Sequence, residues 1–230
     1  MSRSTQLRTA SRERRSHAAR TAAMRARVMT AVVESIAEVG YQRTTAAEIA
    51  RRAGVTWGAV QHHFGDKYGI LMAVLRESFE HFAACLADPP EDQATLEERV
   101  DLFVDRSWEH FSSPLYRSTF QILLNLPSDL ESSWQQTMLG DWSRVWARYF
   151  YADRRAKRRD AGLMRYTLSV LSGLAAMQTL EGSGRRLRST ELGFLKETLR
   201  QNLAYASDDS RSSRARLSRA PTPSRGSPRG

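Results

Sequence analysis

Apolar residues recur along most of the 230-residue chain at the three- and four-residue spacing that is typical of α-helices. No segment shows a convincing alternation of apolar and polar residues, so the pattern predicts no β-strand. The sequence therefore predicts an all-α fold. The expected helices cover residues 19–39, 45–53, 56–63, 67–87, 95–111, 114–126, 128–151, 163–177 and 190–205.

Start and stop signals mark several of these helices. Thr45 and Glu48 have the spacing of a capping box, in which each side chain bonds the other residue's backbone N–H. Gly54 ends that helix, because glycine readily adopts the positive φ of a tight turn. Thr56 and Asp66 are expected to cap the next two helices. The helix after Thr56 is too short to be stable alone, so neighbouring helices must hold it.

Residues 45–64 thus predict two helices joined by a tight turn, with a short second helix held on a rigid support. In a helix-turn-helix, this arrangement presents the second helix to the major groove of DNA. Residues expected to face outward are Thr56, Trp57, Gly58, Gln61, His62 and His63.

The distribution of charge agrees with this interpretation. The formal net charge of +10 divides into +7 over residues 1–67, −1 over 68–205 and +4 over 206–230. A basic first module on a neutral body favours a polyanionic partner, nucleic acid before a membrane. The alternative is a generally basic proteome with solvated tails.

The single cysteine, Cys85, excludes an internal disulfide and favours a reducing, cytoplasmic location. The N-terminus has no apolar core of a secretory signal, and no apolar run is long enough to span a membrane. The expected organisation has a disordered basic arm (1–18), a helix-turn-helix DNA-binding domain (19–66), a helical body (67–205, with 67–87 as connecting helix) and a disordered basic tail (206–230).

The segment "GYQRTTAAEIARRAGVTWGAVQHHFGDKYGILMAVL", residues 40–75, resembles the DNA-binding domain of the TetR/AcrR family. The chain departs from that family's pattern at Gln61, where tyrosine is usual, and at Ile70, where leucine is common. The resemblance implies a three-helix DNA-binding domain and a six-helix ligand-binding and dimerisation domain. It also implies a homodimeric repressor that binds a palindromic operator in double-stranded DNA and is released by a small-molecule effector. Matching positions are Gly40, Tyr41, Thr44, Thr45, Ile49, Ala50, Ala53, Gly54, Val55, Thr56, Gly58, Val60, His63, Phe64, Asp66 and Lys67.

Within this resemblance, we expect eight residues to contact DNA. Thr45 would present a helix N-terminus to phosphate or act only as a cap, and Lys67 would pair with a phosphate. Gln61 would meet phosphate or an adenine edge, and Trp57 would contact DNA or pack locally. The basic arm would lie in the adjacent minor groove or along the phosphates, or would remain unbound. The full set is Arg43, Thr45, Thr56, Trp57, Gly58, Gln61, His63 and Lys67.

The body is rich in aromatic residues that suggest a pocket for a hydrophobic effector, although ordinary core is the alternative for each of them. A DNA-binding architectural or activating protein without an effector remains the competing hypothesis. A cavity with an aromatic lining would favour the ligand-responsive repressor, and a filled core would favour its competitor. The expected pocket residues are Trp108, Phe111, Tyr116, Phe120, Trp134, Met138, Trp142 and Met177.

Enzymatic and metal-dependent functions are not expected. The sequence has no Ser/His/Asp set, no glycine-rich phosphate loop and no paired cysteines. Neighbouring helical residues point in different directions, so His62 and His63 are unsuited to one metal ion. We expect no cofactor. The last two helices are expected to pair with a second copy through apolar stripes at 163–177 and 192–203, forming a four-helix bundle.

Overall fold

The computed structural model describes the backbone of residues 3–126, 128–150, 157–180 and 188–218, and the side chains of 18–126, 138–150, 160–180 and 188–204. All regular structure in these ranges is helical, which confirms the all-α prediction. The elements are α1 (Arg3–Val39), the 3-10 turn η1 (Tyr41–Arg43), α2 (Ala46–Ala53), α3 (Trp57–Phe64), α4 (Lys67–Cys85), α5 (Leu96–Phe111), α6 (Pro114–Leu123), α7 (Ser128–Phe150), α8 (Lys157–Leu180) and α9 (Ser189–Ser218).

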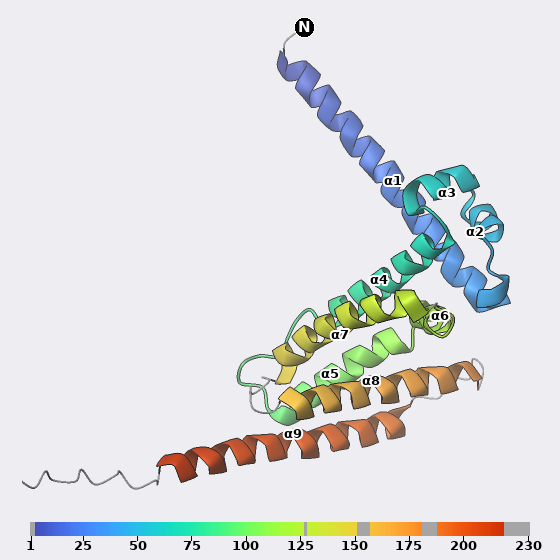
Figure 1. The fold of residues 1–230 in the computed structure, drawn as a ribbon. Coiled ribbons are helices and arrows are strands. Elements are labelled where there is room, and N and C mark those ends of the chain that lie inside the picture. The colour runs from blue at the N-terminus through green and yellow to red at the C-terminus, as the bar shows by residue number, and fades with distance from the viewer. Residues whose placement is uncertain (1–2, 127, 151–156, 181–187, 219–230) are drawn as a thin grey trace, which may run out of the picture.

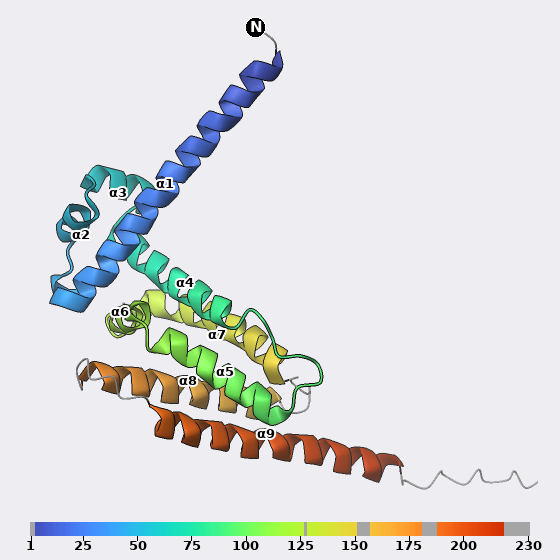
Figure 2. The ribbon, with the colours of Figure 1, turned by 180° about the vertical axis from the view of Figure 1, so that it is seen from behind.

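The helices form a small head and a larger body (Figure 1). The C-terminal half of α1 packs with α2 and α3 in the head, and the rest of α1 projects away from the molecule. Helix α4 leads from the head into the body, where it lies with α5, α6 and α7. Viewed from behind, α8 and α9 lie side by side at the end of the body that is farthest from α1's free end (Figure 2).

The head has its own apolar core. Val32, Ile49, Val60 and Leu71 come from α1, α2, α3 and α4, and each is fully buried. Ile122 of α6 is buried in the same cluster, so a body helix completes the head. Burial of these side chains holds the short helices α2 and α3, which would be marginal alone.

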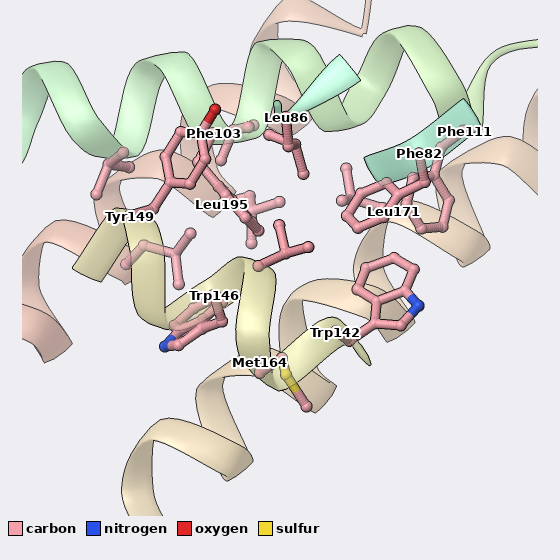
Figure 3. Close-up of a cluster of buried hydrophobic side chains, with 14 of the residues drawn as sticks. Phe82, Leu86, Phe103, Phe111, Trp142, Trp146, Tyr149, Met164, Leu171 and Leu195 are labelled. Atoms are coloured by element: carbon pink, nitrogen blue, oxygen red, sulfur yellow. The ribbon is translucent and has the colours of Figure 1, made fainter. Parts of the chain in front are cut away.

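The core of the body combines aliphatic side chains with a group of aromatic rings (Figure 3). The rings of Phe82 and Trp142 stack with centroids 3.9 Å apart. Phe103 meets Trp146 and Tyr149 edge to face, at centroid distances of 5.4 Å and 5.2 Å. Offset stacking and edge-to-face contacts are the favoured aromatic geometries, so this core joins α4, α5 and α7 firmly.

Helix α9 is bound to its own chain. Its apolar stripe is buried in the body core, and the stripe consists of Leu192, Leu195, Leu199 and Leu203. Beside the stripe, Lys196 pairs with Asp105 of α5 at 2.8 Å, and Arg200 pairs with Asp101 at 2.6 Å. The prediction that the stripe at 192–203 pairs with a second copy is therefore wrong, because α5 already covers it.

Both ends of the chain differ from the prediction of disorder. Helix α1 begins at Arg3 within the arm predicted for 1–18, and α9 continues through the predicted tail as far as Ser218. Neither Gly nor Pro occurs from residue 1 to 39 or from 194 to 218, so nothing in the backbone stops a helix that has started. The low apolar content of both segments suggested disorder, but it did not indicate where α1 begins or where α9 ends.

Candidate functional site

The helix-turn-helix has the geometry that the sequence predicts. The Thr45 hydroxyl accepts a hydrogen bond from the Glu48 backbone N–H at 3.2 Å, which caps α2. Gly54 has φ 63° and ψ 39°, the left-handed conformation of a tight turn. The Thr56 hydroxyl caps α3 by accepting from the Ala59 N–H at 3.2 Å. The caps and the turn thus fix α3 relative to α2.

Only half of the predicted capping box forms. The Glu48 carboxylate accepts hydrogen bonds from Arg51 and Arg52 instead of reaching back to the cap residue, and these bonds lower the pKa of Glu48 to about 2. Arg52 also pairs with Glu38 of α1 at 2.7 Å. Arg51 and Arg52 therefore stabilise α2 internally, and Arg52 also joins α2 to α1. A full capping box does form at Thr95.

The outward face of α3 carries Thr56, Gly58 and Gln61, all exposed, while Val60 points into the head core. Trp57 is half-buried and packs against that core, and its contact with DNA stays a prediction. The exposed face of α3 is small and mainly polar.

His63 and its neighbours lie at the end of α3. His63 is half-buried, and its backbone carbonyl accepts from the Arg25 guanidinium at 3.2 Å. The same guanidinium lies over the Phe64 ring, 4.6 Å from its centroid. Arg25 of α1 thereby holds the C-terminal turn of α3.

The remaining candidates flank α3. Lys67 opens α4, and its ammonium lies 5.0 Å from the centroid of the Tyr41 ring. Arg43 is exposed and donates from Nε to the Val39 carbonyl at 2.8 Å. The eight candidate DNA contacts thus lie on η1, the α2 cap, α3 and the first turn of α4, all within the head.

Gly69 is a residue of the head that sequence reasoning missed. A Cβ placed there would lie 1.8 Å from the carbonyl oxygen of Phe64. The Gly69 N–H also donates to the Asp66 carboxylate at 2.8 Å. Helix α4 therefore starts directly against the end of α3, an approach that only glycine permits.

The body holds a partly open cavity of about 120 Å³ between α4, α5, α6, α7 and α8. Its wall is mainly apolar and aromatic, and no Asp, Glu, Lys or Arg side chain among the described residues lines it. Four predicted pocket residues line it: Phe111, Tyr116, Met138 and Trp142. The remaining lining residues are Leu75, Ser78, Phe79, Phe82, His110, Thr119, Leu123, Leu168 and Ser172.

Four predicted pocket residues are absent from that wall. Phe120 lines a second hollow of about 310 Å³ between α6 and α8. Trp108 packs against the body core. The prediction for Met177 is wrong, because α8 turns this side chain away from the core and leaves it 47% exposed. The side chain of Trp134 lies outside the described residues.

The polar residues of the cavity were not expected from the sequence. His110 lies with Nδ1 3.0 Å from Nδ1 of His81 and Nε2 3.5 Å from the Ser78 hydroxyl. Burial is the main cause that lowers the pKa of His110 to about 3. The Tyr116 and Ser172 hydroxyls are 2.7 Å apart, and burial raises the pKa of Tyr116 to about 12. In the sequence, these residues could have been recognised as polar residues that lie within apolar helical stripes.

Helices α4 and α6 connect the cavity to the head. On α6, Ser118 donates to the Val33 carbonyl of α1 at 3.2 Å, and Gln121 accepts from the Tyr41 N–H at 3.3 Å. The same helix places Tyr116 and Thr119 in the cavity wall. On α4, buried residues of the head core precede residues that line the cavity. A movement of α4 or of α6 would therefore change both the cavity and the head.

Among the described residues, no group of three or more His, Cys, Asp or Glu side chains is placed to hold a metal ion. Within the same residues, no helix is both long and apolar enough to cross a membrane.

Comparison with known proteins identifies the head. The family model described as "Bacterial regulatory proteins, tetR family" matches residues 28–74. The chain is 29% identical to the HTH-type transcriptional regulator BetI of Cronobacter sakazakii over 191 residues, which cover 79% of this chain and 92% of that protein. It is 32% identical to the fatty acid metabolism regulator protein of Bacillus subtilis over 85 residues, 37% of this chain and 42% of that one.

The fold is also similar to solved structures. NalD of Pseudomonas aeruginosa, described as the secondary repressor of the MexAB-OprM multidrug efflux pump, superposes with a TM-score of 0.55 at 20% identity, over 78% of this chain and 94% of NalD. This likeness covers more of the chain than the family model, which matches residues 28–74 alone. Residues 28–74 thus match the TetR family of bacterial regulatory proteins, and the chain is similar over most of its length to an HTH-type transcriptional regulator.

Proposed function

We propose that the protein is a dimeric repressor that acts in the cytoplasm and is released from a palindromic operator by a hydrophobic small molecule. The observation that carries this proposal is the double role of α4 and α6, which line the cavity and also pack in the head. A ligand that favours one position of these helices would favour one position of the head.

Release follows from the geometry of a symmetric dimer. Two heads read two half-sites about one helical turn of DNA apart, roughly 34–36 Å. A ligand that displaces α4 or α6 would change that spacing, because the head core includes residues of both helices. The energy comes from the ligand's preference for the displaced state.

The second copy would dock on α8 and α9. Large apolar side chains remain exposed on these helices, although α5 covers the Leu stripe of α9. Large apolar side chains at the surface are candidates for an interface. They are Tyr166, Met177 and Leu180 of α8 and Phe194 of α9.

The test begins with selection of bound sequences from random DNA, followed by light scattering of the protein with and without the selected DNA. We expect a palindrome, and a particle of twice 26.1 kDa in solution. Phe194→Glu should yield monomers that bind the palindrome much more weakly, because a charge replaces a side chain that is 70% exposed in one subunit. Phe194→Leu is the matched control and should remain dimeric.

Small molecules are then screened by thermal shift, and each hit is added to the protein–operator complex. A hit that dissociates the complex supports the repressor proposal. A monomer that binds a palindrome as tightly as the wild type would contradict the assembly. Activation of transcription from the operator without any ligand, together with no hit that releases the complex, would support the competing hypothesis of an activating protein without an effector.

Lys67→Ala is expected to weaken binding to specific and random DNA alike. Its ammonium stands at the first turn of α4, beside Tyr41, where helix N-terminus and charge both favour a phosphate. Losing one phosphate contact should reduce the slope of log affinity against log salt by about one unit. Arg76→Ala removes an exposed cation farther along α4 and should leave the slope unchanged. An unaltered slope in the Lys67 variant would exclude the phosphate contact.

A further inference from the structure

We propose that the cavity binds an uncharged molecule with one aromatic ring and one hydrogen-bonding oxygen, with the oxygen at the Tyr116–Ser172 pair. The effector role of this ligand rests on the proposed function. Its chemical class rests on the size, charge, hydrogen bonding and wall chemistry of the cavity.

The size of the cavity favours a single ring. Its volume is about 120 Å³. For comparison, an engineered apolar protein cavity of about 150 Å³ binds benzene. Phe79, Phe82, Phe111 and Trp142 supply ring surfaces in the wall, and aromatic rings pack favourably against one another. A molecule with several fused rings would require the helices to separate.

The wall offers no countercharge to an ionic ligand. The described lining contains no acidic side chain and no Lys or Arg. His110 is neutral near pH 7 because burial lowers its pKa to about 3. The Tyr116 phenol is neutral at that pH with its ordinary pKa, and burial raises this pKa further, to about 12. An ion that enters such a site loses its hydration without gaining a countercharge, which costs several kcal/mol in proteins. A neutral ligand avoids this cost.

A donor at the wall favours a ligand that carries an acceptor. In the Tyr116–Ser172 pair, one hydroxyl donates to the other, so one hydroxyl hydrogen remains free to donate to a third atom. An alcohol or carbonyl oxygen on the ring satisfies this donor, and an apolar molecule does not.

The experiment uses four probes of nearly equal size: benzyl alcohol, toluene, benzoate and benzylammonium. Binding to the full-length protein is measured by isothermal calorimetry and by tryptophan fluorescence, without DNA. We expect benzyl alcohol to bind most tightly and toluene to bind about three- to tenfold more weakly, the effect of one hydrogen bond. Benzoate and benzylammonium should show no binding.

Variants locate the polar contact. The double substitution Tyr116→Phe with Ser172→Ala removes both hydroxyls and should reduce the affinity for benzyl alcohol to that for toluene. Ser169→Ala is the matched control on α8, because Ser169 is exposed and bonds only the Arg165 carbonyl of its own helix. Thermal unfolding of the unliganded variants confirms that each is folded. Equal loss in the control and the double variant would overturn the assignment of the oxygen.

Other outcomes separate this inference from the proposed function. Charged probes that bind as tightly as benzyl alcohol, or a failure of every single-ring probe, would overturn the ligand class. If no single-ring probe binds but a larger molecule releases the protein from the operator, the repressor proposal still stands. If benzyl alcohol binds as expected but saturating amounts leave the protein–operator complex intact, the ligand class stands and its effector role is excluded.

Discussion

Gly69→Ala is expected to abolish operator binding and to destabilise the head. The added Cβ would lie 1.8 Å from the carbonyl oxygen and 3.0 Å from the carbonyl carbon of Phe64, so backbone must move to admit it. Overpacking usually costs about 1–3 kcal/mol. We expect the upper end, since these atoms belong to the junction of α3 and α4 and cannot rotate away. Urea unfolding and gel mobility shifts with the selected operator measure the two effects.

Gly58→Ala is the matched control within the same head. Gly58 lies on the outward face of α3, and a Cβ there meets no atom within 4 Å. Alanine in place of glycine inside a helix stabilises it by up to about 1 kcal/mol, so the fold should be at least as stable. Operator affinity should still fall if the α3 backbone closely approaches DNA. Wild-type stability and affinity in Gly69→Ala would show that α3 tolerates displacement.

Arg99→Met is expected to lower the free energy of unfolding by about 1.5–3 kcal/mol, the range for losing hydrogen bonds made by a charged group. Arg99 is only 5% exposed. Its guanidinium donates to the carbonyls of Glu91, Asp92, Ala94 and Tyr149 at 2.8–3.3 Å. It therefore joins the connection before α5 to the end of α7. Methionine matches the aliphatic stem but leaves these carbonyls without this donor.

Two further variants test that explanation at one fixed protein concentration, because dimerisation shifts apparent stability. Arg99→Lys keeps the charge but replaces a planar five-donor group by a single ammonium, so an intermediate loss is expected. Arg106→Met removes a more exposed guanidinium that donates to the Asp88 carbonyl and the Tyr149 hydroxyl, and its effect should be smaller. The net value of one hydrogen bond is about 1 kcal/mol. A smaller loss of unfolding free energy in Arg99→Met would contradict the proposal that Arg99 joins the connection before α5 to the end of α7.

The head could be predicted from sequence because its signals are local. Thr45, Thr56 and Asp66 cap helices through bonds that span three residues, and Gly54 turns the chain through its own φ. Such signals require no knowledge of distant contacts. The predicted bond from the Glu48 carboxylate back to the cap residue does not form, because Arg51 and Arg52 compete for this carboxylate.

The body was predicted as helices but not as a site. Trp108, Trp142 and Met177 look equivalent in sequence, since each is a large apolar residue on an amphipathic helix. Trp142 lines the cavity, Trp108 packs in the core and Met177 is exposed. The difference depends on how α5, α7 and α8 are rotated against one another, which helical periodicity does not specify.

The sequence by itself determined the helical fold, the helix-turn-helix and the location of its outward face, because periodicity, caps and turn glycines act over a few residues. The tertiary structure alone decided three other matters. It assigned the Leu stripe of α9 to its own core, placed Gly69 against Phe64, and brought His110, Tyr116 and Ser172 to one uncharged cavity. Each of these depends on contacts between residues distant in the chain, and such contacts exist only after the helices pack.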